Sequence, residues 1–254
     1  DGMSTNTLGT SNFIAGVNAG NSITSGGGYN TVVGDNAGTA INTGDYNAFY
    51  GFASGDAVTT GEFNTALGAY ALTTDTLGKR SVAVGASALE NQNFTSATMV
   101  YNTAVGYAAG AAVTTGVQNT LIGGLAGDDI ESGVGNICIG YGATTVTNNR
   151  NYSITMGRNV ASVGDYYFTF GVDALDHRVY NNFISNATWT RASDERIKKD
   201  ISTNTDCGLN FINDLRTVTY KFKAPSELDS SMTGYDATKT EAIYKNKMYG
   251  FVAQ

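Results

Sequence analysis

The sequence predicts an all-β chain in which a parallel β-solenoid of about ten 17-residue coils precedes a small α+β segment. Three observations predict this architecture: a glycine that returns every 17 residues, abundant glycine without proline among β-forming residues, and a change of composition after Leu175. They divide the chain into a repetitive region at 1–175, a β connector at 176–192 and a C-terminal segment at 193–254.

The repeat unit begins with Asn, continues with three mostly apolar or Thr residues, and closes with Gly. Its clearest copies begin at Asn30, Asn47, Asn64, Asn102, Asn119 and Asn136, and Ser81 takes the Asn position once. The closing glycines are residues 16, 34, 51, 68, 85, 106, 123, 140, 157 and 171, and six of the nine intervals are 17 residues. This regularity indicates stacked copies, because one unit alone cannot bury its apolar side.

Other positions in the unit are also regular. The residue before the closing Gly is large and apolar, and an alanine stands three residues after it at positions 19, 37, 71, 88, 109, 126, 143 and 174. We therefore expect each coil to contain a strand of about five residues, a glycine turn, a short second strand centred on alanine, and a return loop. Stacked Asn side chains are expected to form amide ladders. The alternative, an all-β sandwich with short strands, predicts variable strand spacing instead.

Composition excludes several classes of protein. The chain has a net charge of −7, 32 glycines and one proline, so it lacks the proline that collagen requires. No basic cluster occurs in the first 190 residues, which argues against nucleic acid, and no apolar stretch is long enough for membrane insertion. His177 is the only histidine, and Cys138 and Cys207 are the only cysteines. We expect no cofactor and no metal site.

The C-terminal segment opens with the densest charge cluster of the chain, Ser193-Asp-Glu-Arg-Ile-Lys-Lys-Asp-Ile201. A helical pattern at 209–215 follows, then a predicted strand at 217–223 and the terminal run Tyr249-Gly-Phe-Val-Ala-Gln254. Considered alone, Ser193 is typical of a helix N-cap, with two acidic residues in the first turn.

The repeats resemble the β-roll heads of trimeric autotransporter adhesins and the repeats of many phage tail fibres, over about residues 12–175. This resemblance implies a homotrimer in which the alanine-rich side of each coil faces a neighbouring copy.

Residues 193–254 resemble the intramolecular chaperone of endosialidase tailspikes, the peptidase S74 family, through the Ser193 cluster, the Thr-Tyr-Lys-Phe strand and the Gly-Phe-Val-Ala-Gln run. The resemblance implies that this segment trimerises the protein and then cuts itself off at the Ala192–Ser193 bond. It assigns Ser193 as the nucleophile and Lys198 as the general base. The family's chaperone continues beyond the Gly-x-x-Ala-Gln run, so we expect 193–254 to be its N-terminal part only.

Together these features predict a structural virion fibre or tailspike segment, outside the cell, that attaches to a host receptor. The expected partners are two further copies of the chain, a glycan or protein receptor on the host surface, and other tail or fibre proteins. The only enzymatic activity expected is single-turnover self-cleavage, with no external substrate.

Two other functions remain open at this point. A bacterial trimeric surface adhesin would share the repeats, but adhesins end in a coiled coil and a membrane anchor. A glycan-degrading tailspike needs paired carboxylates in a groove, whereas the acidic residues here lie mostly in turns beside glycine. The interval between Gly85 and Gly106 holds four extra residues around 91–100, which form either a receptor-contacting loop or a simple bulge.

Overall fold

The computed structural model describes residues 3–4, 8–173, 177–184, 217–220, 224–227, 236–240 and 248–251. The chain divides into two compact units, residues 1–190 and residues 191–254. Unit 1 contains all the repeats. In unit 2, strand β15 (Thr217–Tyr220) pairs antiparallel with β16 (Met248–Phe251), and a short 3-10 turn, η2, spans Pro225–Glu227. The helical pattern expected at 209–215 lies outside the described residues.

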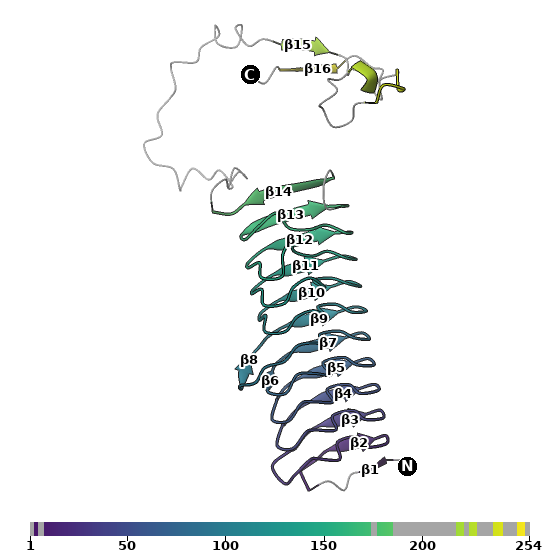
Figure 1. Cartoon of the computed structure of the whole chain (residues 1–254), viewed down its shortest axis with the longest axis vertical. Helices are drawn as coiled ribbons and strands as arrows, with labels where there is room; N and C mark the ends of the chain where they lie inside the picture. The colour runs from purple at the N-terminus through teal and green to yellow at the C-terminus, as the bar shows by residue number, and fades with distance from the viewer. Residues whose placement is uncertain are drawn as a thin grey trace, which may run out of the picture. The chain divides into compact units, whose positions relative to one another are not determined.

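Unit 1 is a column of short strands stacked one above the next (Figure 1). Its sheet has twelve strands in the order β1-β2-β3-β4-β5-β7-β9-β10-β11-β12-β13-β14. Strands β2 to β13 of this order are parallel to their neighbours, whereas β1 and β14 pair antiparallel at the two ends. Their bounds are Met3–Ser4 (β1), Phe13–Ala15 (β2), Thr31–Val33 (β3), Ala48–Tyr50 (β4), Thr65–Leu67 (β5), Val82–Val84 (β7), Thr103–Val105 (β9), Thr120–Ile122 (β10), Ile137–Ile139 (β11), Ile154–Gly157 (β12), Tyr167–Gly171 (β13) and Arg178–Asn182 (β14).

The register confirms the predicted solenoid. Val32 pairs with Phe49, and Phe49 pairs with Ala66, so equivalent residues of successive repeats lie directly above one another. Most strands span three residues rather than the five expected, because the closing glycine leaves the strand conformation. From Gly16 to Gly157, these glycines have φ between 124° and 140°.

The interior of each coil is filled by three rows of side chains. The first row is the middle residue of each strand, such as Val32 or Leu121. The second is the alanine three residues after the closing glycine, and the third lies seven residues after that glycine, as in Ile41 and Val58. These side chains have almost no exposed surface, and they form one continuous core along the column.

The expected second strand around alanine is wrong. Ala37 lies in a turn between Asn36 and Gly38, whose φ angles are 57° and 53°. Left-handed residues on both sides cannot continue a strand. The turn still bonds to the next coil, because the Gly38 N–H donates to the Ser54 carbonyl at 2.9 Å.

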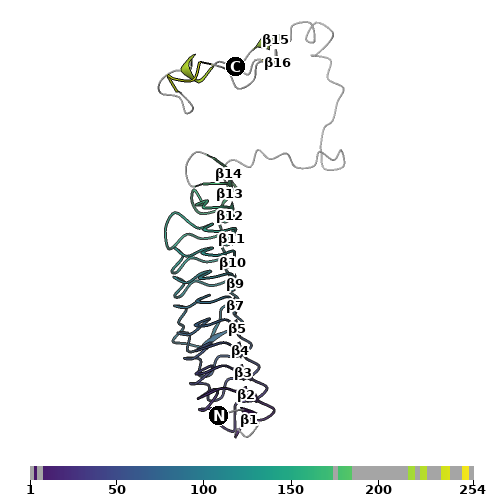
Figure 2. The same cartoon turned by 90° about the vertical axis from the view of Figure 1, so that its right-hand side faces the viewer.

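The expected contact between the alanine-rich side and a neighbouring copy is also wrong. The alanines from Ala37 to Ala143 in this row are fully buried inside their own coil. A narrow coil leaves room only for a methyl group opposite the strand, so the small residue is selected by internal packing. Figure 2 shows the strands along one edge of the column and the return loops along the other.

The predicted amide ladder is present. The Asn119 Oδ1 accepts the Asn136 backbone N–H at 2.9 Å and its Nδ2–H at 3.1 Å. The Asn119 Nδ2 donates to the Gly133 carbonyl at 2.9 Å, which ties the strand start to its own return loop. Equivalent bonds recur through the Asn ladder, defined as Asn12, Asn30, Asn47, Asn64, Asn102, Asn119 and Asn136. Every ladder side chain is buried, so each missing partner leaves a buried polar group unsatisfied.

Replacing Asn119 with Ala is expected to lower the free energy of unfolding by about 3 kcal/mol, because several buried groups lose their partners together. The matched control is Asn91→Ala, since the exposed Asn91 donates only to the Ala111 carbonyl, and its change should stay within about 0.5 kcal/mol. Guanidinium unfolding followed by far-UV circular dichroism measures both. Equal stability of the two variants would contradict a structural role for the ladder.

The corner at Gly123 and Gly124 offers a second matched pair. Gly123 has φ of 130°, and a Cβ there would lie 2.6 Å from the Gly140 carbonyl carbon, whereas a Cβ on Gly124 would make only ordinary contacts. Gly123→Ala should therefore destabilise unit 1 by at least about 2 kcal/mol, and Gly124→Ala should change it little. A thermal unfolding curve for each variant tests this, and a tolerated alanine at Gly123 would refute the close coil approach.

Candidate functional site

The residues assigned to self-cleavage, Ala192, Ser193 and Lys198, lie outside the described residues, so their geometry stays a prediction. The later parts of the same motif are described. Thr217 pairs with Phe251 and Tyr220 pairs with Met248, which brings the Thr-Tyr strand against the start of the terminal run. The strand predicted at 217–223 is thus present over its first four residues.

Two aspartates of the solenoid accept backbone N–H groups at turns. The Asp45 Oδ1 accepts the Gly28 N–H at 2.6 Å, and the Asp35 Oδ1 accepts the Val17 N–H at 3.0 Å. Each of these bonds joins two adjacent coils. Within the described ranges, no group of three or more His, Cys, Asp or Glu side chains is arranged to hold a metal ion.

Cys138 is equally unsuited to chemistry. Its thiol is fully buried as the middle residue of β11, and burial raises its pKa to about 12. A neutral, enclosed thiol is neither a nucleophile nor a metal ligand.

One polar cluster interrupts the core where the repeat itself is irregular. Asp75 and Gln92 occupy the row that Ile41, Val58 and Ile130 fill in other coils, and both are fully buried. The Gln92 Nε2 donates to Asp75 Oδ2 at 2.6 Å and to Ser81 Oγ at 3.0 Å. Asp75 Oδ1 also accepts two backbone N–H groups at 3.1 Å.

This cluster repairs a gap in the Asn ladder. Ser81 stands where other coils have Asn and is too short to reach the next coil. The Gln92 Oε1 takes over, accepting the Asn102 Nδ2–H at 2.9 Å. Sequence reasoning missed Asp75 and Gln92, although their distance of seven residues from Gly68 and Gly85 could have marked them as buried.

The four extra residues follow Gln92 and form a small added sheet. Strand β6 (Gly78–Lys79) pairs in parallel with β8 (Thr98–Met99), and Figure 1 shows this pair at the left-hand edge of the column, apart from the main strands. The loop is therefore anchored by backbone pairing. Whether it contacts a receptor or is a simple bulge remains a prediction.

An aromatic row runs along the residues that precede the Asn positions, namely Tyr29, Tyr46, Phe63, Arg80 and Tyr101. The ring of Tyr46 stacks on Tyr29 at 4.9 Å and on Phe63 at 5.0 Å between centroids. The Arg80 guanidinium lies 5.6 Å from the ring centroids of both Phe63 and Tyr101. The ring faces contact one another, so this row stabilises the stack and offers mainly ring edges to a partner.

The outer face of the main sheet exposes large apolar side chains along the column. We define it as the first and third residues of each strand from β2 to β12 in the main sheet, together with Phe168 and Phe170 of β13, which pair with Ile154 and Met156. The residue between each two points inward. Its third positions include Tyr50, Leu67, Val105 and Ile122, which are between 37% and 56% exposed. None of its positions is Asp, Glu, Lys or Arg.

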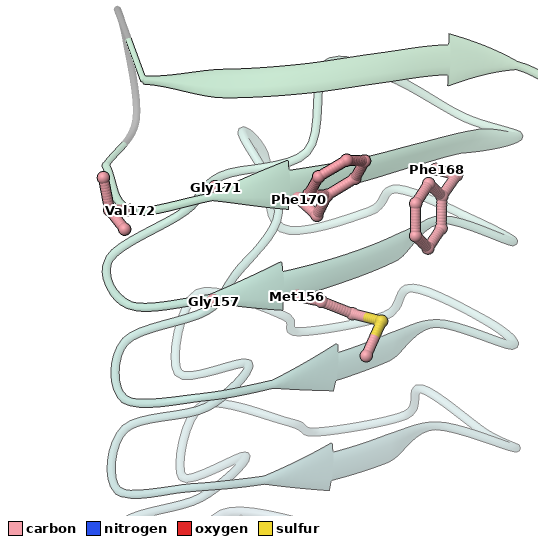
Figure 3. A pocket seen from close by; sticks show the side chains of 6 residues that line it. All are labelled: Met156, Gly157, Phe168, Phe170, Gly171 and Val172. Atoms are coloured by element: carbon pink, nitrogen blue, oxygen red, sulfur yellow. The ribbon is translucent and has the colours of Figure 1, made fainter.

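This face deepens into a hollow near the end of the column. The hollow has a volume of about 600 Å³ and is lined by Met156, Gly157, Phe168, Phe170, Gly171 and Val172. Figure 3 shows Met156 of β12 below the two phenylalanines of β13. The lining is almost wholly apolar, so it suits a hydrophobic side chain.

Comparison with known proteins identifies the C-terminal segment. The architecture described so far is that of a β-solenoid followed by a separate small unit. Residues 193–254 match the model of the peptidase S74 family, described as the chaperone of endosialidase. The match begins at Ser193 and confirms the resemblance seen in the sequence.

A β-solenoid followed by this chaperone fits a phage fibre or tailspike-like protein. No curated protein and no solved structure matched the chain. In the part of the chain that the structure describes, no helix has the length and apolar character needed to cross a membrane.

Burial raises the pKa of Asp75 in the folded chain, which makes a testable pH dependence. The folded state then binds a proton at a pH where the unfolded chain is still ionised. Stability from this group is therefore fully present below the unfolded carboxyl pKa of about 4 and is lost as pH rises through the folded value. The free energy of unfolding should be measured for the unmodified chain and for Asp75→Asn at pH 7 and near pH 5. As the pH falls, the unmodified chain should gain stability relative to the variant, so that its free energy of unfolding approaches or exceeds that of the variant. Parallel pH curves would contradict this.

Proposed function

We propose that the chain is a homotrimeric fibre or tailspike segment of a virion, which attaches to a host receptor and is matured by self-cleavage before Ser193. The solenoid supplies the rigid extended part, and the C-terminal segment assembles three chains in register. The observation that carries this proposal is the chaperone of endosialidase match at 193–254, directly after the repeats.

The match also favours this function over its competitors. A bacterial adhesin shares the repeats but is not expected to end in this chaperone. A glycan-degrading tailspike needs two carboxylates facing a substrate groove. The described aspartates at 35 and 45 instead accept backbone N–H groups from adjacent coils. A receptor-binding role, with the host glycan or protein bound rather than cut, therefore has the better support.

Self-cleavage needs only groups that the chain itself contains. With Lys198 accepting its proton, the Ser193 Oγ attacks the adjacent Ala192 carbonyl carbon, so the Ala192–Ser193 amide is exchanged for an ester and the Ser193 amine is released. Water then hydrolyses the ester, which leaves the Ala192 carboxylate and restores the Ser193 hydroxyl. A lysine can act as this base when its pKa is lowered, as in other Ser–Lys pairs.

The spacing of the pair suggests how cleavage depends on assembly. Residues 193 and 198 would lie about 140° apart on one regular helix, because each residue turns about 100°. Either Ser193 lies at or before the helix cap, or Ser193 of one chain meets Lys198 of another. The second arrangement would permit cutting only after the chains have assembled.

Ser193→Ala and Lys198→Ala should each give an uncut full-length trimer, whereas the unmodified chain yields fragments that meet at Ala192–Ser193. Intact and native mass spectrometry measure both properties, and Lys199→Ala is the matched control that should still cut. A cut product from either dyad variant would end its assignment.

Co-expression of the two dyad variants tests the arrangement between chains. Mixed trimers pair an intact Ser193 with an intact Lys198 on different chains, so partial cutting should return. If the mixture stays uncut while the unmodified chain cuts, the pair forms within one chain.

A further inference from the structure

We propose that the outer face of the main sheet is the surface through which copies of this chain pack against each other. The proposal rests on the proposed function only for the existence of the trimer, and it names the surface that faces the trimer axis. It replaces the alanine row, which the structure places inside each coil.

The composition of this face is that of a buried surface, although the face is exposed to solvent in a single chain. Its third positions are Ala15, Val33, Tyr50, Leu67, Val84, Val105, Ile122, Ile139, Met156 and Phe170. Its first positions are Phe13, Thr31, Ala48, Thr65, Val82, Thr103, Thr120, Ile137, Ile154 and Phe168. A parallel sheet generally has both faces covered, and its strands are then rich in apolar residues. All ten third positions here are apolar, and the first positions are apolar or Thr.

Charged side chains are confined to other parts of unit 1. Lys79 of β6 forms an ion pair with Glu62 at 3.1 Å, and Arg150 lies 3.7 Å from Asp165 in the return loops. Unit 1 is therefore amphipathic around its axis, with one uncharged side and one charged side. Depletion of charge is the compositional mark of an interface core.

The size of the face is that of a functional patch. Ten strands about 4.8 Å apart make a stripe on the order of 45 Å long, and three residues per strand make it about 10 Å wide. Its flat area is then on the order of 450 Å², the size of the largest apolar patch on a typical monomer, and such patches are often functional.

A second copy of the same chain is the occupant that fits this stripe. The side chains of the outer face recur at the strand spacing along the whole column. A partner must therefore present groups at the same spacing to cover the whole face. Another copy, aligned in the same direction, has the same repeat by construction. The chaperone family at 193–254 implies trimer formation, so such copies are held side by side.

The hollow supports the same conclusion. Phe168 and Phe170 leave an apolar space beside Met156 that the chain's own side chains do not fill. At the same level, an aligned neighbour presents equally large apolar side chains. We expect the contact between copies to be tightest here.

Cysteine labelling of the full-length trimer tests the proposal without disturbing the fold. Ile122→Cys and Val105→Cys lie on the outer face, and Thr115→Cys lies exposed on the return loop that precedes β10. A Cys207→Ser background leaves only the buried Cys138 as a native thiol. A maleimide should label the two outer-face cysteines at least about tenfold more slowly than Thr115→Cys, because reaction needs an exposed thiolate.

Charge insertion is the second arm of the test. Ile122→Lys should abolish the trimer or shift it to smaller species in native mass spectrometry, while Thr115→Lys stays trimeric with the same circular dichroism spectrum. A trimer in which the outer-face cysteines label as fast as Thr115→Cys would overturn the surface assignment but leave the proposed function intact. An unmodified chain that is monomeric would overturn both. Slow outer-face labelling accompanied by an extra bound mass would show another occupant and would also overturn it.

Discussion

The structure depends on burying polar backbone in a very narrow coil. Each turn of unit 1 is too thin to hide its strand ends behind bulky side chains, so every buried N–H and C=O group must find a partner in its own coil or the next. The Asn ladder meets this requirement. One amide side chain accepts the N–H of the coil above and donates to the return loop of its own coil, as Asn119 does with Asn136 and Gly133.

That constraint explains why the polar cluster at Asp75 takes the form it does. Losing the Asn at Ser81 would leave Asn102 without an acceptor in the coil below. A buried glutamine from the core row supplies one, and a buried carboxylate then satisfies that glutamine. Asp75 and Gln92 therefore occupy two positions that are apolar in other coils, and the hydrogen bonds of the Asn ladder continue past Ser81. The preference for satisfied hydrogen bonds over apolar burial at this step follows from the high cost of an unpaired buried amide.

Much of unit 1 could be predicted because glycine and asparagine have few substitutes at their positions. Only glycine tolerates the φ of the corner at Gly123 together with a neighbouring backbone at contact distance. Along the ladder, a side-chain amide accepts from the next coil and also reaches the return loop of its own coil as a donor. The side of the alanine row could not be predicted, since a small residue suits a tight interior and a close contact between chains equally well. Left-handed residues such as Asn36 and Tyr46 carry no signal strong enough to separate a turn from a short strand. The chaperone segment was recognised from its motif and matched by the family model at 193–254. The self-cleavage chemistry assigned to Ser193 stays a prediction, because that residue lies outside the described residues.

The in-register pairing of whole repeats has an evolutionary consequence. Each coil contacts only the coils directly above and below it, and each of its rows continues in line through them. Duplicating or losing one 17-residue unit would therefore lengthen or shorten the column by a single step while every surface keeps its orientation. The length of the column can be adjusted in this way by unequal recombination between repeats, and no new contact between coils is needed.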